Sequence, residues 1–395
     1  MTGFTQAGLR RLHDVLARHV VSGDLPGLVA LVSRHGETHV ETLGTLTAGT
    51  GTPMRRDTIF RIASSSKPIT AAAAMLLVED CVLRLDDPLD EWLPELANRR
   101  VLRRLDGPLA DTEPAKRPIT LRDLLTFGFG FGVPFTAGDL PIVHAMAEAG
   151  LMPSPTPPQL APDEYLRRLG ELPLMHQPGE GWLYHHGLEV ASVLLARAAH
   201  TSFASLLEER LLGPLGMRDT GFHVPGEKLD RLATSYDRRP GSDELIVDDE
   251  PRTGHWSRPA IFPSGAGGLV STVDDCHAFF QMLLRKGRAA GGRILSRASV
   301  ELMTSDQLTP QQMPDGRPLG DELGWGFGGS VVVRRRELGS GVGRYGWTGG
   351  SGTSTYMDRA EDLVEILFTQ RLLGGPYPQG WLQDFSTATY AAFAD

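Results

Sequence analysis

Near its N-terminal end the sequence reads Phe60-Arg61-Ile62-Ala63-Ser64-Ser65-Ser66-Lys67-Pro68-Ile69-Thr70. Ser64 and Lys67 are three residues apart, so a helix starting here would bring the hydroxyl and the amine onto one face. A serine hydroxyl is a weak nucleophile until a base takes its proton. Lysine serves as that base when burial or nearby positive charge lowers its pKa. The apolar flanks, including residues 69–78, predict that this helix is buried.

The Ser-x-x-Lys pattern is short, and by itself it also fits a serine helix cap followed by a solvated lysine. A second stretch of sequence favours a catalytic role for Ser64 and Lys67 over a helix cap. It runs from Gln177 to Gly187 and places Tyr184 between a Pro-Gly turn and an apolar helix. A buried ammonium beside Tyr184 would favour the phenolate, so Tyr184 is a candidate general base or proton relay. The alternative is an inert tyrosine packed at a helix start.

A third stretch is rich in glycine and reads Gly346-Trp347-Thr348-Gly349-Gly350-Ser351-Gly352. Glycines let backbone N–H groups approach a substrate closely. One such N–H could pair with that of Ser64 to form an oxyanion hole. The alternative is an ordinary hairpin turn. A Ser-His-Asp site with a Gly-x-Ser-x-Gly elbow is disfavoured, because that motif does not occur.

The composition limits the classes of function. The formal net charge of −9 over 395 residues disfavours nucleic acid and anionic membranes as partners. Cys81 and Cys276 lack metal-ligand spacing, so we expect no metal or other cofactor and two buried free thiols. There is no signal-peptide pattern and no apolar run of about 18 residues. We therefore expect a cytoplasmic protein whose partner is a small molecule; the oligomeric state stays open.

The order of the expected elements indicates the architecture. Helices are expected at 5–22, 162–169, 187–199 and 381–393, and strands at 28–32, 39–43, 326–333, 352–357 and 363–369. Strands at both ends predict an α+β or α/β fold with a central antiparallel sheet flanked by helices. Its domain comprises residues 1–84 and 226–395, with a mostly helical domain at 85–225 and the site in the cleft between them. We expect Phe129 and Phe131, in the Gly128–Gly132 segment, to form a flexible apolar pocket wall.

Five stretches together resemble the serine β-lactamase and penicillin-binding protein superfamily, over almost the whole chain. The closer likeness is to its class C β-lactamase-like branch and, within it, to the family VIII carboxylesterases. The five are Phe60–Pro68, Ile119–Thr126, Pro178–Tyr184, Leu211–Met217 and Pro263–Leu269. The resemblance implies a β-lactamase-like fold and acyl transfer through a covalent acyl-serine.

By this resemblance Ser64 is the nucleophile, Lys67 activates it and Tyr184 is the general base. The N–H groups of Ser64 and Gly350 match the oxyanion hole. Whether Lys67 or Tyr184 is the acylation base stays open.

Two positions depart from the common pattern. His186 stands where many relatives have asparagine, and Trp347 stands where β-lactamases generally have lysine or histidine. A cation at the second place would suit a substrate carboxylate, whereas Trp347 offers an apolar face. We expect Trp347, His186, Phe129 and Phe131 to contact the substrate.

The sequence thus predicts a serine esterase for small or short-acyl esters. A weak β-lactamase, an amidase or an acyltransferase of the same fold is the first alternative. A non-catalytic binding protein is the remote one.

Overall fold

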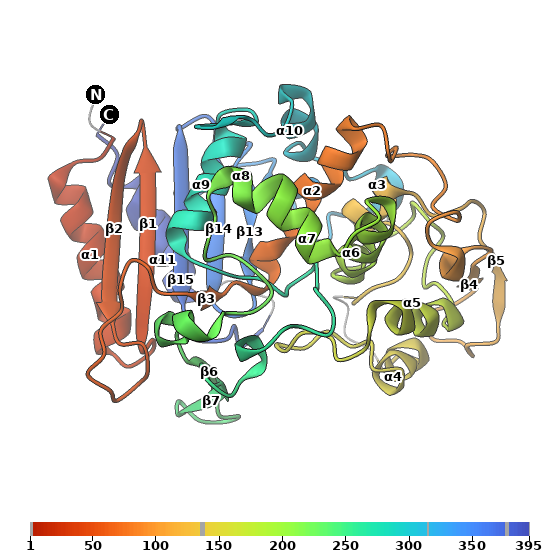
Figure 1. Ribbon diagram of the computed structural model, residues 1–395, viewed down its shortest axis with the longest axis horizontal. Helices are drawn as coiled ribbons and strands as arrows, with labels where there is room; N and C mark the ends of the chain where they lie inside the picture. The colour runs from red at the N-terminus through yellow and green to blue at the C-terminus, as the bar shows by residue number, and fades with distance from the viewer. Residues whose placement is uncertain (1–2, 135–138, 314–315, 376–378, 395) are drawn as a thin grey trace.

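A seven-stranded antiparallel sheet forms the centre of the protein in a computed structural model that describes residues 3–134, 139–313, 316–375 and 379–394. The strand order is β11-β12-β13-β14-β15-β1-β2 (Figure 1). The N-terminal part of the chain supplies β1 (Gly27–Arg34) and β2 (Glu37–Gly44). The C-terminal part supplies β11 (Leu323–Trp325), β12 (Ser330–Val332), β13 (Tyr345–Gly349), β14 (Thr353–Asp358) and β15 (Leu363–Thr369).

Helices cover both faces of the sheet. Strand β1 is buried along its whole length, which explains its continuous apolar sequence. Leu28, Ala30 and Val32 pack with α1 (Gln6–Val21) and α11 (Gly380–Tyr390) on one face. Val29 and Leu31 belong to the main core on the other face, where α9 (Val273–Leu284) packs against β14 and β15. Adjacent residues of one strand therefore stabilise two different layers.

The remaining helices lie mostly beyond one end of the sheet, on the right of Figure 1. They are α2 (Lys67–Glu79), α3 (Leu121–Leu125), α4 (Pro141–Glu148), α5 (Pro162–Glu171), α6 (His186–Ala198), α7 (Phe203–Leu207), α8 (Gly213–Leu215) and α10 (Arg297–Met303).

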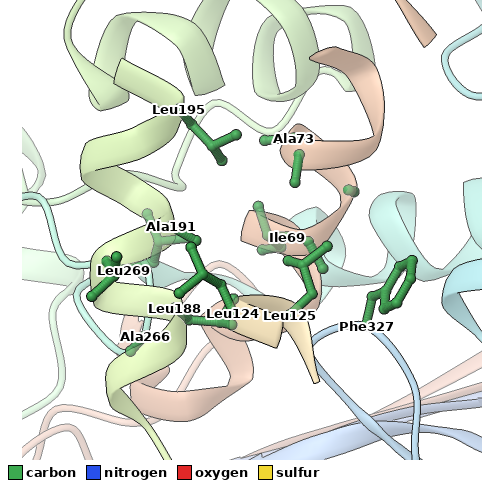
Figure 2. Close-up of a cluster of buried hydrophobic side chains, with 14 of the residues drawn as sticks. Ile69, Ala73, Leu124, Leu125, Leu188, Ala191, Leu195, Ala266, Leu269 and Phe327 are labelled. Carbon is green, nitrogen blue, oxygen red and sulfur yellow. The ribbon is translucent and has the colours of Figure 1, made fainter. Parts of the chain in front are cut away.

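Helices α2 and α6 pack against each other and hold the segment that contains Ser64. Figure 2 shows Ile69 and Ala73 of α2 on the side that faces Leu188, Ala191 and Leu195 of α6. All of these side chains are buried. Small residues in α2 let the two helices approach closely, and the large side chains of α6 fill the space between them.

Four two-stranded sheets complete the fold. They pair β3 (Phe60–Arg61) with β8 (Val270–Ser271), β4 (Arg100–Leu102) with β5 (Thr112–Pro114), β6 (Ser235–Arg238) with β7 (Leu245–Asp249), and β9 (Arg288–Ala289) with β10 (Gly292–Arg293).

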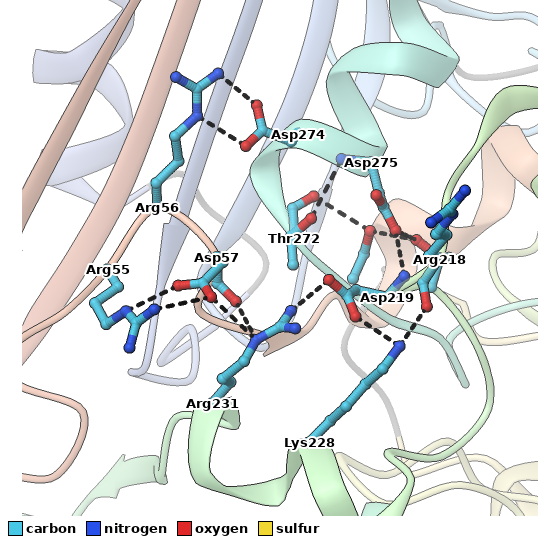
Figure 3. A network of polar contacts seen from close by, with 12 residues as sticks. Arg55, Arg56, Asp57, Arg218, Asp219, Lys228, Arg231, Thr272, Asp274 and Asp275 are labelled. Carbon is cyan, nitrogen blue, oxygen red and sulfur yellow. Dashed lines mark hydrogen bonds and ion pairs between the residues drawn. The ribbon is translucent and has the colours of Figure 1, made fainter.

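A network of charged side chains ties the loop before β3 to its neighbours (Figure 3). Arg56 forms a two-pronged pair with Asp274 of α9. Arg231 contacts both Asp57 and Asp219. Exposed pairs add little stability each, but together they fix where the chain enters the strand that precedes Ser64.

The predicted fold is confirmed, with local differences. The helices expected at 5–22, 162–169, 187–199 and 381–393 correspond to α1, α5, α6 and α11. The single strand expected at 326–333 is wrong, because a Gly326–Gly329 turn separates β11 from β12. Both cysteines are free, but Cys81 is exposed rather than buried. The proposed domain boundaries stay a prediction.

No single described helix is long and apolar enough to span a membrane. Only α6 together with Phe203–Leu215 passes a test of length and composition, as a pair bent by 83°.

Candidate active site

The Ser64 hydroxyl lies 2.8 Å from the Nζ atom of Lys67. Ser64 occupies a short 3-10 turn, Ala63–Ser66, that leads directly into α2 at Lys67. Pro68 suits the first turn of that helix, where its missing N–H is not needed. Ala63 enters the turn with φ of 43°, a left-handed conformation that costs a non-glycine residue on the order of 1 kcal/mol. The strained turn places the two side chains as the i, i+3 spacing predicts.

Lys67 is fully buried, and its amine is held from three sides. Besides Ser64, Nζ contacts the Ala266 carbonyl oxygen at 2.5 Å and lies 4.7 Å from the centre of the Tyr184 ring. Burial lowers the pKa of Lys67 to about 7, against the opposing charge of Glu189. A large share of Lys67 is therefore a neutral amine near neutral pH, and a neutral amine can accept the Ser64 proton.

Tyr184 lies above Lys67 in a group of aromatic rings. Its ring stacks on Trp182 and meets Phe127 edge-on, with centroids 5.7 and 5.3 Å apart. Its hydroxyl hydrogen-bonds with Ser64 and accepts the indole N–H of Trp347 at 2.5 Å. Burial raises the pKa of Tyr184 well above its ordinary value and outweighs both hydrogen bonds. The expectation that Lys67 favours a phenolate is therefore wrong, because desolvation dominates and Tyr184 stays a neutral phenol.

The hairpin between β13 and β14 is fastened to the Ser64 turn. Thr353 Oγ1 donates to the Ile62 carbonyl at 2.9 Å, and Ser351 Oγ donates to the Arg61 carbonyl. A Cβ atom on Gly349 would lie 2.2 Å from the Ile62 oxygen, so only glycine fits there. The glycine-rich stretch is thus a hairpin turn. Its Gly349 also lets the backbone of the hairpin pack closely against the backbone at Ile62.

Ser64 and Gly350 line the same cavity, which has a volume of about 320 Å³. Neither backbone N–H donates a hydrogen bond to another residue in the described part of the chain. Two N–H groups without acceptors beside a nucleophile are what an oxyanion hole requires.

The rest of the cavity wall is apolar and aromatic with a few charged groups. One side is the proline-rich segment 150–158, and Leu372 and Leu373 form part of another. The aromatic and ionisable side chains on the wall are Arg61, Tyr165, Tyr184, His185, Glu189, Asp248 and Trp256. The charge of Arg61 is already balanced by its buried ion pair with Asp249.

Three of the predicted substrate contacts lie elsewhere. Phe129 and Phe131 are fully buried and belong to the main core. His186 is also fully buried, and its Nε2 atom bonds to the Leu151 carbonyl at 2.9 Å. None of the three lines the cavity, because apolar burial takes these side chains into the helical layer. Trp347 is half-buried at the site and reaches it through Tyr184.

Sequence reasoning also missed Glu189, which the structure places at the site beside His185. His185 and Glu189 both line the cavity, and His185 Nε2 lies 3.2 Å from Glu189 Oε1. Ser264 donates to the same oxygen at 2.7 Å. A signal existed, since Glu189 is the one carboxylate within the mostly apolar stretch 187–199. A buried charge of this kind commonly has a partner.

This fold, with a serine and a buried lysine in contact at a cavity, is that of the β-lactamase-fold serine hydrolase superfamily. The chain belongs to the beta-lactamase family, whose model matches residues 12–388.

Three similar proteins illustrate the relationship. Protein Rv1367c of Mycobacterium tuberculosis is 37% identical over 374 residues, which cover 92% of this chain and 89% of that protein. Esterase EstB of Burkholderia gladioli is 31% identical over 386 residues, covering 92% and 91%. Among solved structures, EstCE1, described as a hydrolase with promiscuous acyltransferase activity, superposes with a TM-score of 0.81 at 25% identity, covering 98% and 99%. These matches confirm the predicted fold and superfamily.

Proposed function

We propose that this protein is a serine carboxylesterase that cleaves small or short-acyl esters through an acyl-Ser64 intermediate. One observation carries the proposal: the Ser64 hydroxyl contacts the buried Lys67 amine at a cavity lined by Ser64 and Gly350, whose N–H groups have no acceptor among the described residues. Burial lowers the pKa of Lys67 to about 7, which suits the amine to act as a base. Nucleophile, base and oxyanion donors thereby meet at one point. The esterase EstB, similar over most of both chains, supports the same reaction class.

In the acylation step the Lys67 amine accepts the Ser64 proton while Ser64 Oγ attacks the ester carbonyl carbon. The carbonyl oxygen gains the negative charge and receives hydrogen bonds from the N–H groups of Ser64 and Gly350. When the intermediate collapses, the bond to the alcohol oxygen breaks. The Tyr184 phenol protonates that oxygen and regains a proton from the Lys67 ammonium.

Deacylation follows the same path with water in place of the alcohol. Water loses a proton to the Lys67 amine through Tyr184, and its oxygen attacks the acyl carbon. The bond to Ser64 Oγ breaks, the carboxylic acid leaves, and Ser64 regains its proton from Lys67. Each turnover returns Lys67 and Tyr184 to their starting protonation states, so no further reactant is needed.

The cavity wall favours neutral and apolar esters. Trp347 lies beside Tyr184 where a cation would bind a substrate carboxylate. The wall also carries Asp248 and Glu189, whose charges repel an anion. Strong β-lactamase activity is disfavoured on both grounds.

Acyl transfer to an alcohol is a second candidate, because an alcohol can take the place of water in the deacylation step. The cavity wall is largely apolar, so it can bind the carbon chain of an alcohol, whereas water has no apolar part for it to bind. EstCE1 is described as having this promiscuous activity. Adding a primary alcohol to the assay and measuring both products distinguishes hydrolysis from transfer.

The direct test measures hydrolysis of p-nitrophenyl acetate and butyrate beside nitrocefin. Ser64→Ala should abolish ester hydrolysis and labelling by a fluorophosphonate probe, whereas the neighbouring Ser65→Ala should retain both. Lys67→Ala and Tyr184→Phe should each lose roughly a hundredfold or more in kcat/KM. A folded Ser64→Ala protein that still hydrolyses the esters, or a wild type with equal nitrocefin turnover, contradicts the proposal.

A further inference from the structure

Glu189 is a buried carboxylate within the cavity wall that the reaction above does not use. It lies in the first turn of α6 and is 1% exposed. Burial of a carboxylate is unfavourable unless hydrogen bonds and opposite charge compensate for it. Burial alone would raise the pKa of Glu189, but the hydrogen bonds from His185 and Ser264 and the charge of Lys67 hold it below its ordinary value. Glu189 is therefore ionised.

One oxygen of Glu189 accepts both of these hydrogen bonds. Oε1 receives the Ser264 hydroxyl at 2.7 Å and the His185 ring N–H at 3.2 Å. Oε2 is buried and has no hydrogen-bond partner among the described residues. A buried acceptor left without a partner is unfavourable, and a native structure that retains one calls for an explanation.

Ser264 and its loop connect Glu189 to Lys67. Ser264 Oγ also accepts the Gly267 N–H at 3.0 Å, which closes the loop around Ala266. On the same loop the Gly265 carbonyl accepts the Thr70 hydroxyl of α2 at 2.7 Å. The loop is thus held at both ends, and its Ala266 carbonyl contacts the Lys67 amine. Through Ser264 and the loop that it closes, Glu189 helps to fix the Ala266 carbonyl that accepts a hydrogen bond from Lys67.

The His185 side leads to Tyr184. His185 has φ of 84° and ψ of −64°, and the His186 N–H bonds to the Tyr184 carbonyl at 3.2 Å. This is a γ-turn of the rare, strained form. Such a conformation is unfavourable for a residue other than glycine and persists only when the surroundings enforce it. The bond from the His185 ring to Glu189, four residues along the chain, helps to hold the turn that aims Tyr184.

We propose that Glu189 is a positioning residue that holds Lys67 through the Ser264–Gly267 loop and Tyr184 through His185, and that its negative charge stabilises the Lys67 ammonium formed during acylation. This inference rests on the proposed function. The ionisable groups that face the amine are Tyr184, a neutral phenol; His185, whose pKa burial lowers; and Glu189 itself. Glu189 is thus the anion among them.

The proposal predicts a change in pH dependence that a purely structural role would not produce. The charge of Glu189 opposes the lowering of the Lys67 pKa, so its removal lowers that pKa further. In Glu189→Gln the neutral amine should persist to lower pH, and the acidic limb of kcat/KM should move to lower pH. The kcat should also fall at least tenfold with little change in KM, because misplaced proton-transfer groups slow the chemical step.

Glu365→Gln is the matched control. Glu365, which lies on β15, is also 1% exposed and forms an ion pair with Arg344. Its Oε2 atom is buried without a partner among the described residues. Its substitution should lower the thermal midpoint without moving the acidic limb. Glu189→Asp should restore the wild-type limb, because it restores the charge, but only part of kcat. If Glu189→Gln does not fold, Ser264→Ala tests the positioning role alone, with kcat reduced and the limb unchanged.

The pH dependence of fluorophosphonate labelling separates this inference from the esterase proposal. The probe reacts with an activated serine and needs no ester turnover. If no tested ester is hydrolysed, the esterase proposal fails, yet the labelling rate still reports the protonation state of Lys67. A shift of the labelling profile to lower pH in Glu189→Gln supports the inference. An unchanged profile in folded Glu189→Gln, in both labelling and hydrolysis, overturns it.

Discussion

The indole N–H of Trp347 donates a 2.5 Å hydrogen bond to the hydroxyl oxygen of Tyr184. The two residues come from different parts of the fold, β13 and the segment before α6. The bond aims the phenol at Ser64 from the sheet side, while Phe127 and Trp182 confine its ring from the helical side. Trp347 therefore acts on the proton-transfer group and is more than an apolar wall for the substrate.

Replacing Trp347 tests this relationship. Trp347→Phe retains an aromatic ring but removes the donor, and we expect kcat/KM for p-nitrophenyl butyrate to fall about tenfold, the range for one hydrogen bond to a catalytic group. In a double-mutant cycle with Tyr184→Phe the two losses should not add, because Trp347 acts through Tyr184. Additive losses would instead indicate that Trp347 contacts the substrate independently.

The Lys67 amine predicts the pH dependence of activity. Burial lowers its pKa to about 7, and acylation requires the neutral form. As the pH rises through about 7, kcat/KM should therefore rise tenfold per unit at first and then level off. Tyr184 should add no alkaline limb near neutral pH, because burial raises its pKa. Measuring kcat/KM over a range of pH with several esters checks this. If the pH at which kcat/KM levels off differs between substrates, Lys67 is not the group that sets it.

The hairpin that carries the oxyanion N–H predicts opposite outcomes at two adjacent glycines. A Cβ atom on Gly349 would lie 2.2 Å from the Ile62 carbonyl oxygen, whereas a Cβ atom on Gly350 meets nothing within 4 Å. Gly349→Ala must push the hairpin away from the Ser64 turn, so we expect a lower thermal midpoint and at least a tenfold loss of activity. Gly350→Ala should retain the wild-type thermal midpoint, because its Cβ meets no protein atom. Thermal melts and ester assays on the two variants test this prediction. An equal thermal midpoint in both would contradict the close packing of Gly349 against the Ile62 carbonyl.

The sequence was sufficient to predict the residues whose spacing is local. Ser64 and Lys67 meet because they are three positions apart at a helix start, and β1 was recognisable as a short apolar strand. Glu189 and Ser264 could not be paired from the sequence, because they are 75 positions apart. Only the packing of α6 against the Ser264–Gly267 loop brings them together. Phe129 and Phe131 were misplaced for a related reason. An apolar segment near a site has the same pattern whether it lines a cavity or fills the core.

Asp248 should make the rate depend on the charge of the substrate. Asp248 lines the cavity and bonds to the Ser235 hydroxyl at 3.0 Å, and burial raises its pKa. At about pH 8.5 the carboxylate is ionised, so it should repel an anionic acyl group. We expect the p-nitrophenyl monoester of glutaric acid to react at least tenfold more slowly than p-nitrophenyl 5-methylhexanoate, its uncharged analogue of similar shape.

In Asp248→Asn the ratio of kcat/KM for the neutral ester to kcat/KM for the anionic ester should fall severalfold. We expect kcat/KM to rise for the anionic ester and to stay unchanged for the neutral one. Asp243→Asn is the control, since Asp243 is largely exposed and does not line the cavity. The ratio of the two kcat/KM values cancels any general effect of the substitution on folding or on Ser64. An unchanged ratio in Asp248→Asn would mean that solvent screens this carboxylate, and the preference would then have to come from the absence of a cation at Trp347.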